Sequence, residues 1–252
     1  MVLDDFKLTD QVALVTGAGK GLGRALAVGL AEAGAHIAGV YRTACDETRR
    51  QVEALGRRFH PIQADLAANP TAPVVAQALK GLGRLDILVN NAGTIRRAPA
   101  LDYSERDWDE VMALNLKSGF FLSQAAARHW VAQGQGGKII FIASILAFQG
   151  GILIPPYTAS KHGTVGLVRL LSNEWASKGI HVNAIAPGYM VTDSTEALRE
   201  DPVRSQTILN RIPASRWGDP DDLKGAVVFL ASRASSYVHG ETLVVDGGWL
   251  GR

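Results

Sequence analysis

Short apolar runs alternate along the chain with longer amphipathic stretches, and this alternation constrains the fold more than any other feature. The runs are rich in β-branched residues and are bounded by Gly, Asn or Asp, as is typical of strands buried on both faces. We expect strands at 12–16, 36–41, 59–64, 85–90, 138–143, 181–186 and 242–246. Helical patterns lie between them at 22–33, 46–55, 108–132, 158–177 and 220–232. This order predicts an α/β fold, a doubly wound parallel sheet with helices on both faces.

The 252 residues contain no repeat, low-complexity run or linker, so we expect a single domain over 1–252. The least regular stretch, 192–217, is polar and is interrupted by Pro202 and Pro213. In a doubly wound sheet, ligands bind at the carboxyl ends of the strands. A long insertion after the strand at 181–186 is therefore well placed to form a substrate lid, with a plain surface loop as the alternative.

The composition argues against several classes of protein. The 26 Lys and Arg residues are interspersed with 24 Asp and Glu, without the basic stripe of a nucleic-acid-binding protein. The first ten residues do not resemble a signal peptide, and no apolar stretch approaches the roughly 20 residues of a membrane helix. The single cysteine, Cys45, excludes a disulfide framework and suits the reducing cytoplasm. The histidines lack the spacing of metal ligands, so we expect no metal site.

A glycine-rich turn, TGAGKGLG from Thr16 to Gly23, joins the first expected strand to the first helix. In this setting Gly17 allows the tight turn, Gly21 lets a pyrophosphate approach the backbone, and Gly23 lets helix and sheet pack closely. The helix N-terminus offers unpaired N–H groups and a partial positive charge to the phosphates. We therefore expect the turn to bind a dinucleotide, with contacts from Thr16, Gly17, Lys20, Gly21, Leu22 and Gly23.

The end of the second strand bears on which dinucleotide is bound. A carboxylate there would bind the adenosine ribose of NAD, but this strand ends in Tyr41 followed by Arg42. Arg42 and Lys20 could instead pair with a 2′-phosphate, the first as a bidentate guanidinium. NADP(H) is therefore favoured over NAD(H). The alternative is that both are ordinary solvated cations.

Two further strand ends are expected to face the cofactor. Asp65 and Leu66 follow the third strand, where Asp65 is placed to contact the adenine edge. The sequence NNAG ends the fourth strand, and its small residues would let backbone lie against the cofactor, with contacts from Asn91, Ala92 and Gly93. Asn90 and Asn91 could equally be plain turn residues.

A tyrosine and a lysine four residues apart carry the chemistry that we expect. Tyr157 and Lys161 share one face at the start of a helix. Phenol titrates near ~10 in water, and a nearby ammonium favours the phenolate. Ser144, at the end of the fifth strand, could hold a substrate oxygen beside the tyrosine. Asn115, within the long helix at 108–132, could hold a water that links Lys161 to solvent.

Taken together, TGAGKGLG, NNAG, Asn115, Ser144, YTASK (157–161) and PGYMVT (187–192) resemble, in order and spacing, the short-chain dehydrogenase/reductase family. The resemblance implies a single-domain Rossmann fold with a seven-stranded sheet, assembled as a homotetramer. It implies an enzyme with the catalytic set Asn115, Ser144, Tyr157 and Lys161, in which Tyr157 and Lys161 also contact the cofactor and Lys161 binds the nicotinamide ribose. By the same resemblance, Pro187, Gly188 and Thr192 lie at the nicotinamide end.

Longer strings, among them NNAGTIRR and VVDGGWLGR, resemble the sugar-acid branch of this family. That branch implies hydride transfer between NAD(P) and a secondary alcohol or ketone of a small sugar acid, of gluconate, 2-deoxygluconate or 2-keto-3-deoxygluconate type. A guanidinium binds a carboxylate well, and Arg96 and Arg97 follow NNAG. We expect one of Arg96, Arg97 and Arg216 to orient the substrate carboxylate, and Arg96 is the first candidate. The alternative is that these arginines pair with acids at a subunit interface.

Two other functions share the same signals. A 3-oxoacyl-thioester reductase would have this fold and catalytic set, but it needs an entrance for a pantetheine arm and a basic docking patch, and neither is clear in the sequence. A non-catalytic nucleotide-binding sensor would keep the fold, but the intact Ser144, Tyr157 and Lys161 argue against it.

Overall fold

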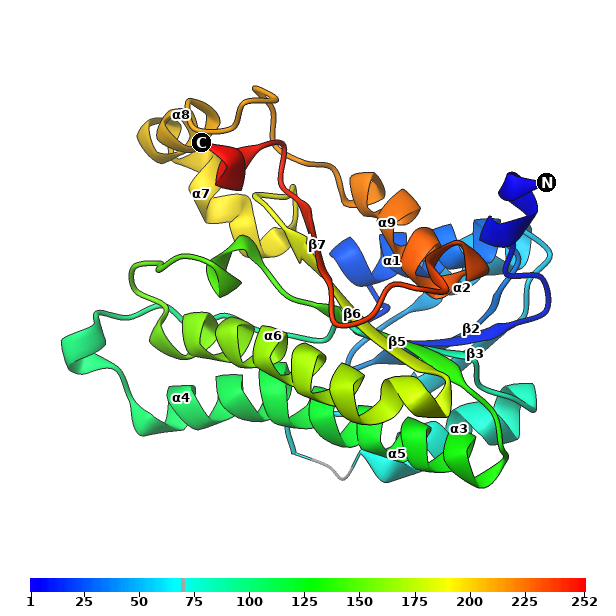
Figure 1. Cartoon of the computed structure of the whole chain (residues 1–252). Coiled ribbons are helices and arrows are strands. Elements are labelled where there is room, and N and C mark those ends of the chain that lie inside the picture. The colour runs from blue at the N-terminus through cyan, green and yellow to red at the C-terminus, as the bar shows by residue number, and fades with distance from the viewer. Residues whose placement is uncertain (69–70) are drawn as a thin grey trace.

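The computed structural model describes residues 1–68 and 71–252. Seven strands form one parallel sheet in the order β3-β2-β1-β4-β5-β6-β7 (Figure 1). Their bounds are β1 (Val12–Thr16), β2 (His36–Tyr41), β3 (Phe59–Gln63), β4 (Ile87–Asn90), β5 (Gly137–Ile142), β6 (Ile180–Pro187) and β7 (Thr242–Val245). The predicted α/β doubly wound Rossmann fold is therefore confirmed.

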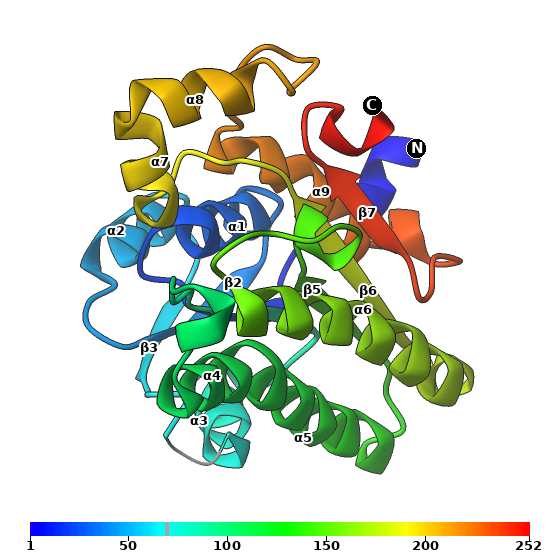
Figure 2. The same cartoon turned by 90° about the vertical axis from the view of Figure 1, so that its left-hand side faces the viewer.

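Helices cover both faces of the sheet (Figure 1). One face carries α1 (Gly21–Glu32), α2 (Asp46–Ala54) and α9 (Lys224–Ala231). The other face carries α3 (Ala72–Leu82), α4 (Glu105–Met112), α5 (Ser118–Ala132) and α6 (Pro155–Trp175). Beyond the carboxyl end of β6 lie α7 (Glu196–Glu200) and α8 (Pro202–Leu209), which Figure 2 views from that side.

The strands are buried on both faces because their side chains alternate between two apolar cores. In β1, Val12 and Leu14 pack into the core under α3, α5 and α6, whereas Ala13 and Val15 pack into the core under α1 and α9. All four are fully buried. The period of two residues along a strand produces this division, and it explains why the strands appear in the sequence as continuous apolar runs.

Some helices differ from the prediction. The helix α3 was not predicted, although Val74, Ala78 and Leu82 recur at a spacing of four and are buried, and Gly83 ends the helix at φ 85°. The helix predicted at 108–132 begins earlier, where Ser104 Oγ accepts a hydrogen bond from Asp107 N. It also contains a π-helical turn, Ala113–Lys117, which the apolar pattern did not indicate.

The segment 192–217 is more regular than we expected. Besides a 3-10 turn at Asp193–Thr195 it contains α7 and α8, and the Asp201 carboxylate caps α8 by accepting from Val203 N and Arg204 N. Neither helix was predicted, because the segment is polar and contains two prolines. Pro202 is nevertheless compatible with α8, because it stands at the first helical position, where proline is tolerated.

Within the described residues, no helix has both the length and the apolar character needed to cross a bilayer. In the same residues, no group of three or more His, Cys, Asp or Glu side chains is arranged to hold a metal ion.

Candidate active site

Three polar side chains from two neighbouring elements meet at the carboxyl edge of the sheet. Ser144 follows β5, and its Oγ accepts a hydrogen bond from Leu146 N at 3.1 Å, which leaves the hydroxyl hydrogen to donate elsewhere. Tyr157 and Lys161 lie near the start of α6, with Lys161 Nζ 5.5 Å from the centroid of the Tyr157 ring. Lys161 Nζ donates to Ile142 O at 2.6 Å, which fixes the ammonium between β5 and the tyrosine.

Burial dominates the titration of this group. Burial raises the pKa of Tyr157, while a hydrogen bond with the Ser144 side chain and the charge of Arg97 act to lower it. Burial also lowers the pKa of Lys161 to about 8. Burial therefore outweighs both of the effects that lower the pKa of Tyr157.

Asn115 lies in the π-helical turn and is buried. Its Oδ1 accepts from Thr94 N at 2.8 Å, and its Nδ2 donates to Thr94 O at 2.9 Å and to Ser160 Oγ at 3.4 Å. The side-chain amide of Asn115 thus ties the loop that follows NNAG to α6, the helix that carries Tyr157.

The glycine-rich turn is closed tightly against the start of α1. Gly17 and Gly21 have φ of 66° and 52°, a region that favours glycine. A Cβ on Gly23 would lie 2.0 Å from Gly17 O, so helix and turn touch there by backbone. No side chain caps the N-terminus of α1 at Lys20, which leaves its N–H groups to a phosphate. These features fit the expected dinucleotide.

A hydrogen-bond network joins the ends of β1 and β4 beside this turn. Thr16 Oγ1 donates to Val89 O and accepts from the backbone N–H groups of Asn91 and Ala92, both at 2.9 Å. Asn91 Nδ2 donates to Thr16 O at 2.8 Å. Gly93 lies close to Asn115, because a Cβ on it would be 3.4 Å from Asn115 Oδ1. Thr16 and Asn91 therefore hold the ends of β1 and β4 together beside the glycine-rich turn.

The two cations expected near a 2′-phosphate have different surroundings. Arg42 is exposed after β2, and among the described residues its guanidinium makes no hydrogen bond or ion pair. Lys20 Nζ lies 2.5 Å from Asp193 Oδ2, a carboxylate in the 192–217 segment. Because Lys20 is already paired, Arg42 is the more available phosphate ligand of the two.

Other residues expected to contact the cofactor lie at or after the carboxyl ends of β2 and β3. Tyr41 ends β2, and Asp65 follows β3, where its Oδ1 accepts from Ala67 N at 3.0 Å. The side chains of Leu22 and Leu66 pack into the two cores, so only their backbone could face a cofactor.

At the end of β6, Pro187 and Gly188 lead to Thr192, which lies over the glycine-rich turn. A Cβ on Gly21 would be 3.7 Å from Thr192 Cγ2. A Cβ on Gly188 would be 2.7 Å from Asp246 Cα, so this glycine is required by packing against the end of β7.

The structure separates the three arginines considered for the substrate. Arg96 Nη2 donates to Glu110 Oε1 at 2.6 Å, and Arg216 holds both oxygens of Asp222 at 2.6 and 2.9 Å. Arg97 makes no ion pair within the described residues. Its guanidinium donates to Ser194 O at 3.1 Å.

A small aromatic cluster holds the 192–217 segment on the protein. Trp249 is 4% exposed and packs with Ile145, Ile208 and Ile212. The Arg211 guanidinium lies 4.0 Å from the Trp249 ring, and Trp249 Nε1 donates to Gln149 Oε1 at 3.1 Å. The C-terminal turn therefore connects α8 to the loop that follows Ser144.

Two positioning residues escaped the sequence analysis. Thr48, in α2, donates to Ala18 O at 2.7 Å and so ties the glycine-rich turn to α2. Ser160 donates to Tyr157 O at 2.7 Å. Both are fully buried hydroxyls on helices. Their helical position was visible in the sequence, but their partners were not.

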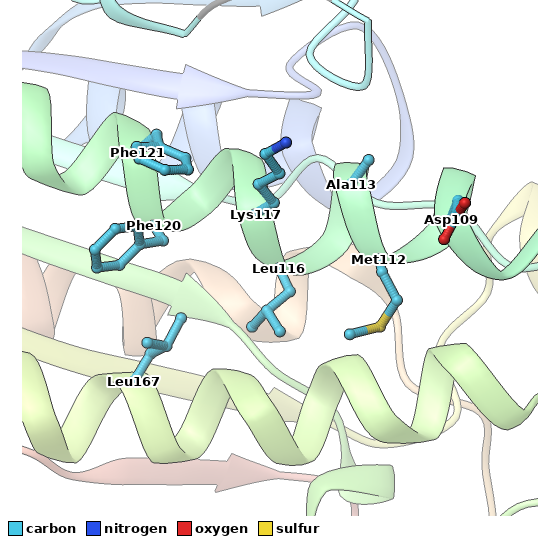
Figure 3. A pocket seen from close by; sticks show the side chains of 8 residues that line it. All are labelled: Asp109, Met112, Ala113, Leu116, Lys117, Phe120, Phe121 and Leu167. Carbon is cyan, nitrogen blue, oxygen red and sulfur yellow. The ribbon is translucent and has the colours of Figure 1, made fainter.

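An apolar groove of about 660 Å³ runs between the α4–α5 helix and α6, away from this site (Figure 3). It is lined by Asp109, Met112, Ala113, Leu116, Lys117, Phe120, Phe121 and Leu167. Exposed large side chains continue along the same helix, with Trp108 at 41% and Val131 at 49% exposure.

Several known proteins resemble this chain in sequence. A family model described as enoyl-(acyl carrier protein) reductase matches residues 17–250. The chain is 58% identical, over all of both chains, to 2-dehydro-3-deoxy-D-gluconate 5-dehydrogenase of Escherichia coli. It is 40% identical to gluconate 5-dehydrogenase of Gluconobacter oxydans, over 97% of this chain and 96% of that one.

A solved structure of gluconate 5-dehydrogenase from Burkholderia cenocepacia, in complex with NADP and tartrate, superposes with a TM-score of 0.94 at 40% identity, with both chains fully covered. The glycine-rich turn, the Ser144–Tyr157–Lys161 group and these similarities lead to one conclusion: the chain belongs to the short-chain dehydrogenase/reductase family.

Proposed function

We propose that the protein transfers a hydride between NADP and a secondary alcohol or ketone of a small sugar acid. The observation that carries the proposal is that Ser144, Tyr157 and Lys161 converge at one edge of the sheet. The glycine-rich turn and the N-terminus of α1, which no side chain caps, lie at the same edge. The similarity to sugar-acid dehydrogenases supports the substrate class. The match to a solved relative with NADP supports the cofactor.

Each residue of the site has its own role in the proposed reaction. In the oxidation direction, Tyr157 Oη takes the proton of the substrate hydroxyl, and in reduction it returns a proton to the carbonyl oxygen. Ser144 Oγ donates to that oxygen and stabilises the negative charge that develops on it. Lys161, held by Ile142 O, would bind the nicotinamide ribose of the cofactor and, by its charge, would favour the phenolate. The dinucleotide, when bound, supplies or accepts the hydride.

A substrate panel tests this function. The purified protein is assayed by NAD(P)H absorbance with gluconate, 2-deoxygluconate, 2-keto-3-deoxygluconate and a 3-oxoacyl thioester, each with both cofactors. We expect turnover of at least one sugar acid and a preference for NADP(H). Turnover of the thioester alone would contradict the substrate class, and the absence of turnover with every compound would point to a nucleotide-binding sensor.

We infer that Arg42 selects NADP. A charge-assisted contact to a phosphate contributes about 1.5–3 kcal/mol, which corresponds to a factor of roughly 10–150 in affinity. The variant Arg42→Asp should lower kcat/KM with NADP by about 100-fold while NAD becomes the better cofactor. Arg50→Asp makes the same charge change on the exposed side of α2 and should leave the cofactor ratio unaltered. An unchanged ratio in Arg42→Asp would contradict this role.

We further infer a homotetramer that acts in the cytoplasm and uses the 192–217 segment as a lid. The apolar groove between α4–α5 and α6 and the exposed Trp108 and Val131 suit contact between copies. Light scattering should give four times the chain mass of 26.9 kDa. The lid is supported by the Lys20–Asp193 and Arg97–Ser194 contacts, which reach it from the glycine-rich turn and from the loop that follows β4.

A further inference from the structure

Three basic side chains lie together at the amino edge of the sheet, the edge opposite Ser144. Lys138 on β5 and His181 on β6 are register partners on neighbouring strands. His239, in the loop that leads to β7, stacks on His181 with the ring centroids 4.1 Å apart and the planes inclined by 18°. Lys138 Nζ donates to Ser235 Oγ at 3.3 Å, in the turn before this loop. The proposed reaction uses none of these residues.

The loop 236–240 depends on this cluster and on a few hydrogen bonds for its place on the sheet. Asn183 Nδ2 donates to Val238 O at 2.9 Å, and Gly240 N donates to Val182 O at the same distance. The tip of the loop is in water, with Tyr237 97% exposed. Because β7 is the last strand of the sheet and pairs with β6, these contacts with β6 hold the amino end of β7.

The charges within the cluster act against one another. Burial lowers the pKa of Lys138 to about 8. Burial, followed by the charges of Lys138 and His239, lowers the pKa of His181 to about 4, against which only a hydrogen bond with the Val238 backbone acts. Burial and the charge of Lys138 also lower the pKa of His239. Each group therefore makes it harder for the others to hold a proton.

The other charged side chains on the elements around the cluster do not offset these charges. On the side of α9 and the first strands they form ion pairs of their own, namely Asp5–Arg233, Arg84–Asp86 and Glu32–Lys224. The remaining ones, on and after α6 and just before β7, are Arg169, Glu174, Lys178 and Glu241. Within the described residues, no carboxylate acts on the pKa of Lys138, His181 or His239.

Neither imidazole has an acceptor for a second proton. In both rings Nδ1 is buried and has no hydrogen-bond partner in the part of the chain that the structure describes. A neutral imidazole can place its lone pair there, whereas an imidazolium carries an N–H at both nitrogens. A buried N–H without an acceptor is costly, and two charged rings in contact repel each other. The closed arrangement of the loop therefore fits the uncharged form of the pair.

We propose that His181, His239 and Lys138 form an acid-released clasp: the uncharged imidazole pair holds the loop 236–240 and the amino end of β7 on the sheet at neutral pH, and protonation of the pair releases them. The imidazole pKa is low while the loop is closed and returns to about 6.5 when the loop is open in water. The open state therefore binds more protons. The clasp is complete above about pH 6.5 and is lost as the pH falls toward the closed-state pKa of about 4.

Amide hydrogen exchange in the NADP-loaded protein tests the clasp, with each rate divided by the intrinsic exchange rate at the same pH. The amides of Ala184, Gly240 and Glu241 report on opening, because each donates a hydrogen bond across the β6–β7 junction. One imidazole with a pKa of about 4 closed and about 6.5 open should raise the opening constant about tenfold between pH 7.5 and 5.5. The amides of β1 serve as the internal reference and should show a smaller rise.

Three variants separate the clasp from a general effect of acid. In the double variant His181→Gln/His239→Gln, the opening constant should agree within about twofold at the two pH values, since no imidazole titrates at the junction. Lys138→Met keeps both rings and removes the charge beside them, so its rise should be smaller than that of the wild type. His129→Gln removes a histidine on α5, at the other face of the sheet, and should keep the tenfold rise.

Four results would each overturn the proposal. They are a wild-type opening constant that does not change with pH, a rise in β1 as large as that at the junction, a full rise in the double variant, and a rise in Lys138→Met equal to that of the wild type. The wild-type and Lys138→Met results decide the case if the double variant does not fold, because both proteins keep the stacked rings.

Discussion

Tyr157→Phe should reduce turnover of the sugar acid by about 10³-fold, within the range of 10² to 10⁴ that general acid–base groups contribute. The substitution removes one oxygen and keeps the ring that lies beside Lys161 Nζ. The NADPH affinity, measured by nucleotide fluorescence, should therefore stay within a few-fold of wild type. Tyr237→Phe makes the same change at a tyrosine that is 97% exposed, and it should have no effect.

The pH dependence gives a second measurement on the same pair of proteins. Burial raises the pKa of Tyr157, so the phenolate is the minor form at neutral pH. In the oxidation direction, log kcat/KM of the wild type should rise with pH at a slope of about one, because the phenolate is the base. The residual rate of Tyr157→Phe should lack this rise. Wild-type-like turnover or an unchanged pH profile in the variant would remove Tyr157 from the mechanism.

Gly23→Ala should destabilise the protein and weaken dinucleotide binding together. The new Cβ would stand 2.0 Å from Gly17 O and 2.5 Å from Asn91 Nδ2, and the nearest of these atoms is backbone that cannot turn aside. Overpacking of this kind costs about 3 kcal/mol at the upper end of its usual range, which lowers Tm by roughly 6–12 °C for a chain of this size. Because the turn must move away from α1, we expect the Kd for NADPH to rise at least about tenfold.

Gly225→Ala is the matched control for this glycine. Gly225 lies at the start of α9, and a Cβ there would have no atom within 4 Å. Its Tm should stay within a few degrees of wild type, or rise slightly, because alanine loses less backbone entropy on folding. A Gly23→Ala protein with unchanged Tm and unchanged NADPH affinity would show that the turn yields easily and would contradict the packing argument.

Most of the fold could be predicted because parallel strands buried on both faces leave an uninterrupted apolar signal. The bounds of β1 and β2 were predicted to the residue, and the other strands to within two residues. The errors lie where that signal is diluted. The helix α3 carries Pro73 in its first turn, α8 begins at Pro202, and the π-helical turn changes backbone pairing without changing the apolar pattern.

The site was predictable at the level of the residues that it brings together and less so at the level of their partners. The positions of Ser144, Tyr157 and Lys161 follow from strand ends and helix spacing, both of which are local properties. Whether an exposed cation is free depends on acids far away in sequence, such as Asp193 for Lys20. This long-range information separates Arg97 from Arg96, and no local pattern contains it.

The aromatic cluster at the C-terminal turn has a consequence for protein engineering. Trp249 lies about a hundred positions from Ser144 in sequence, yet it packs on the neighbouring Ile145 and on the two isoleucines of the 192–217 segment. Mutagenesis libraries that vary only the sequence neighbours of Tyr157 would leave this cluster untouched. Substitutions at Ile208, Ile212 and Trp249 should be varied jointly, because side chains in mutual contact change binding non-additively.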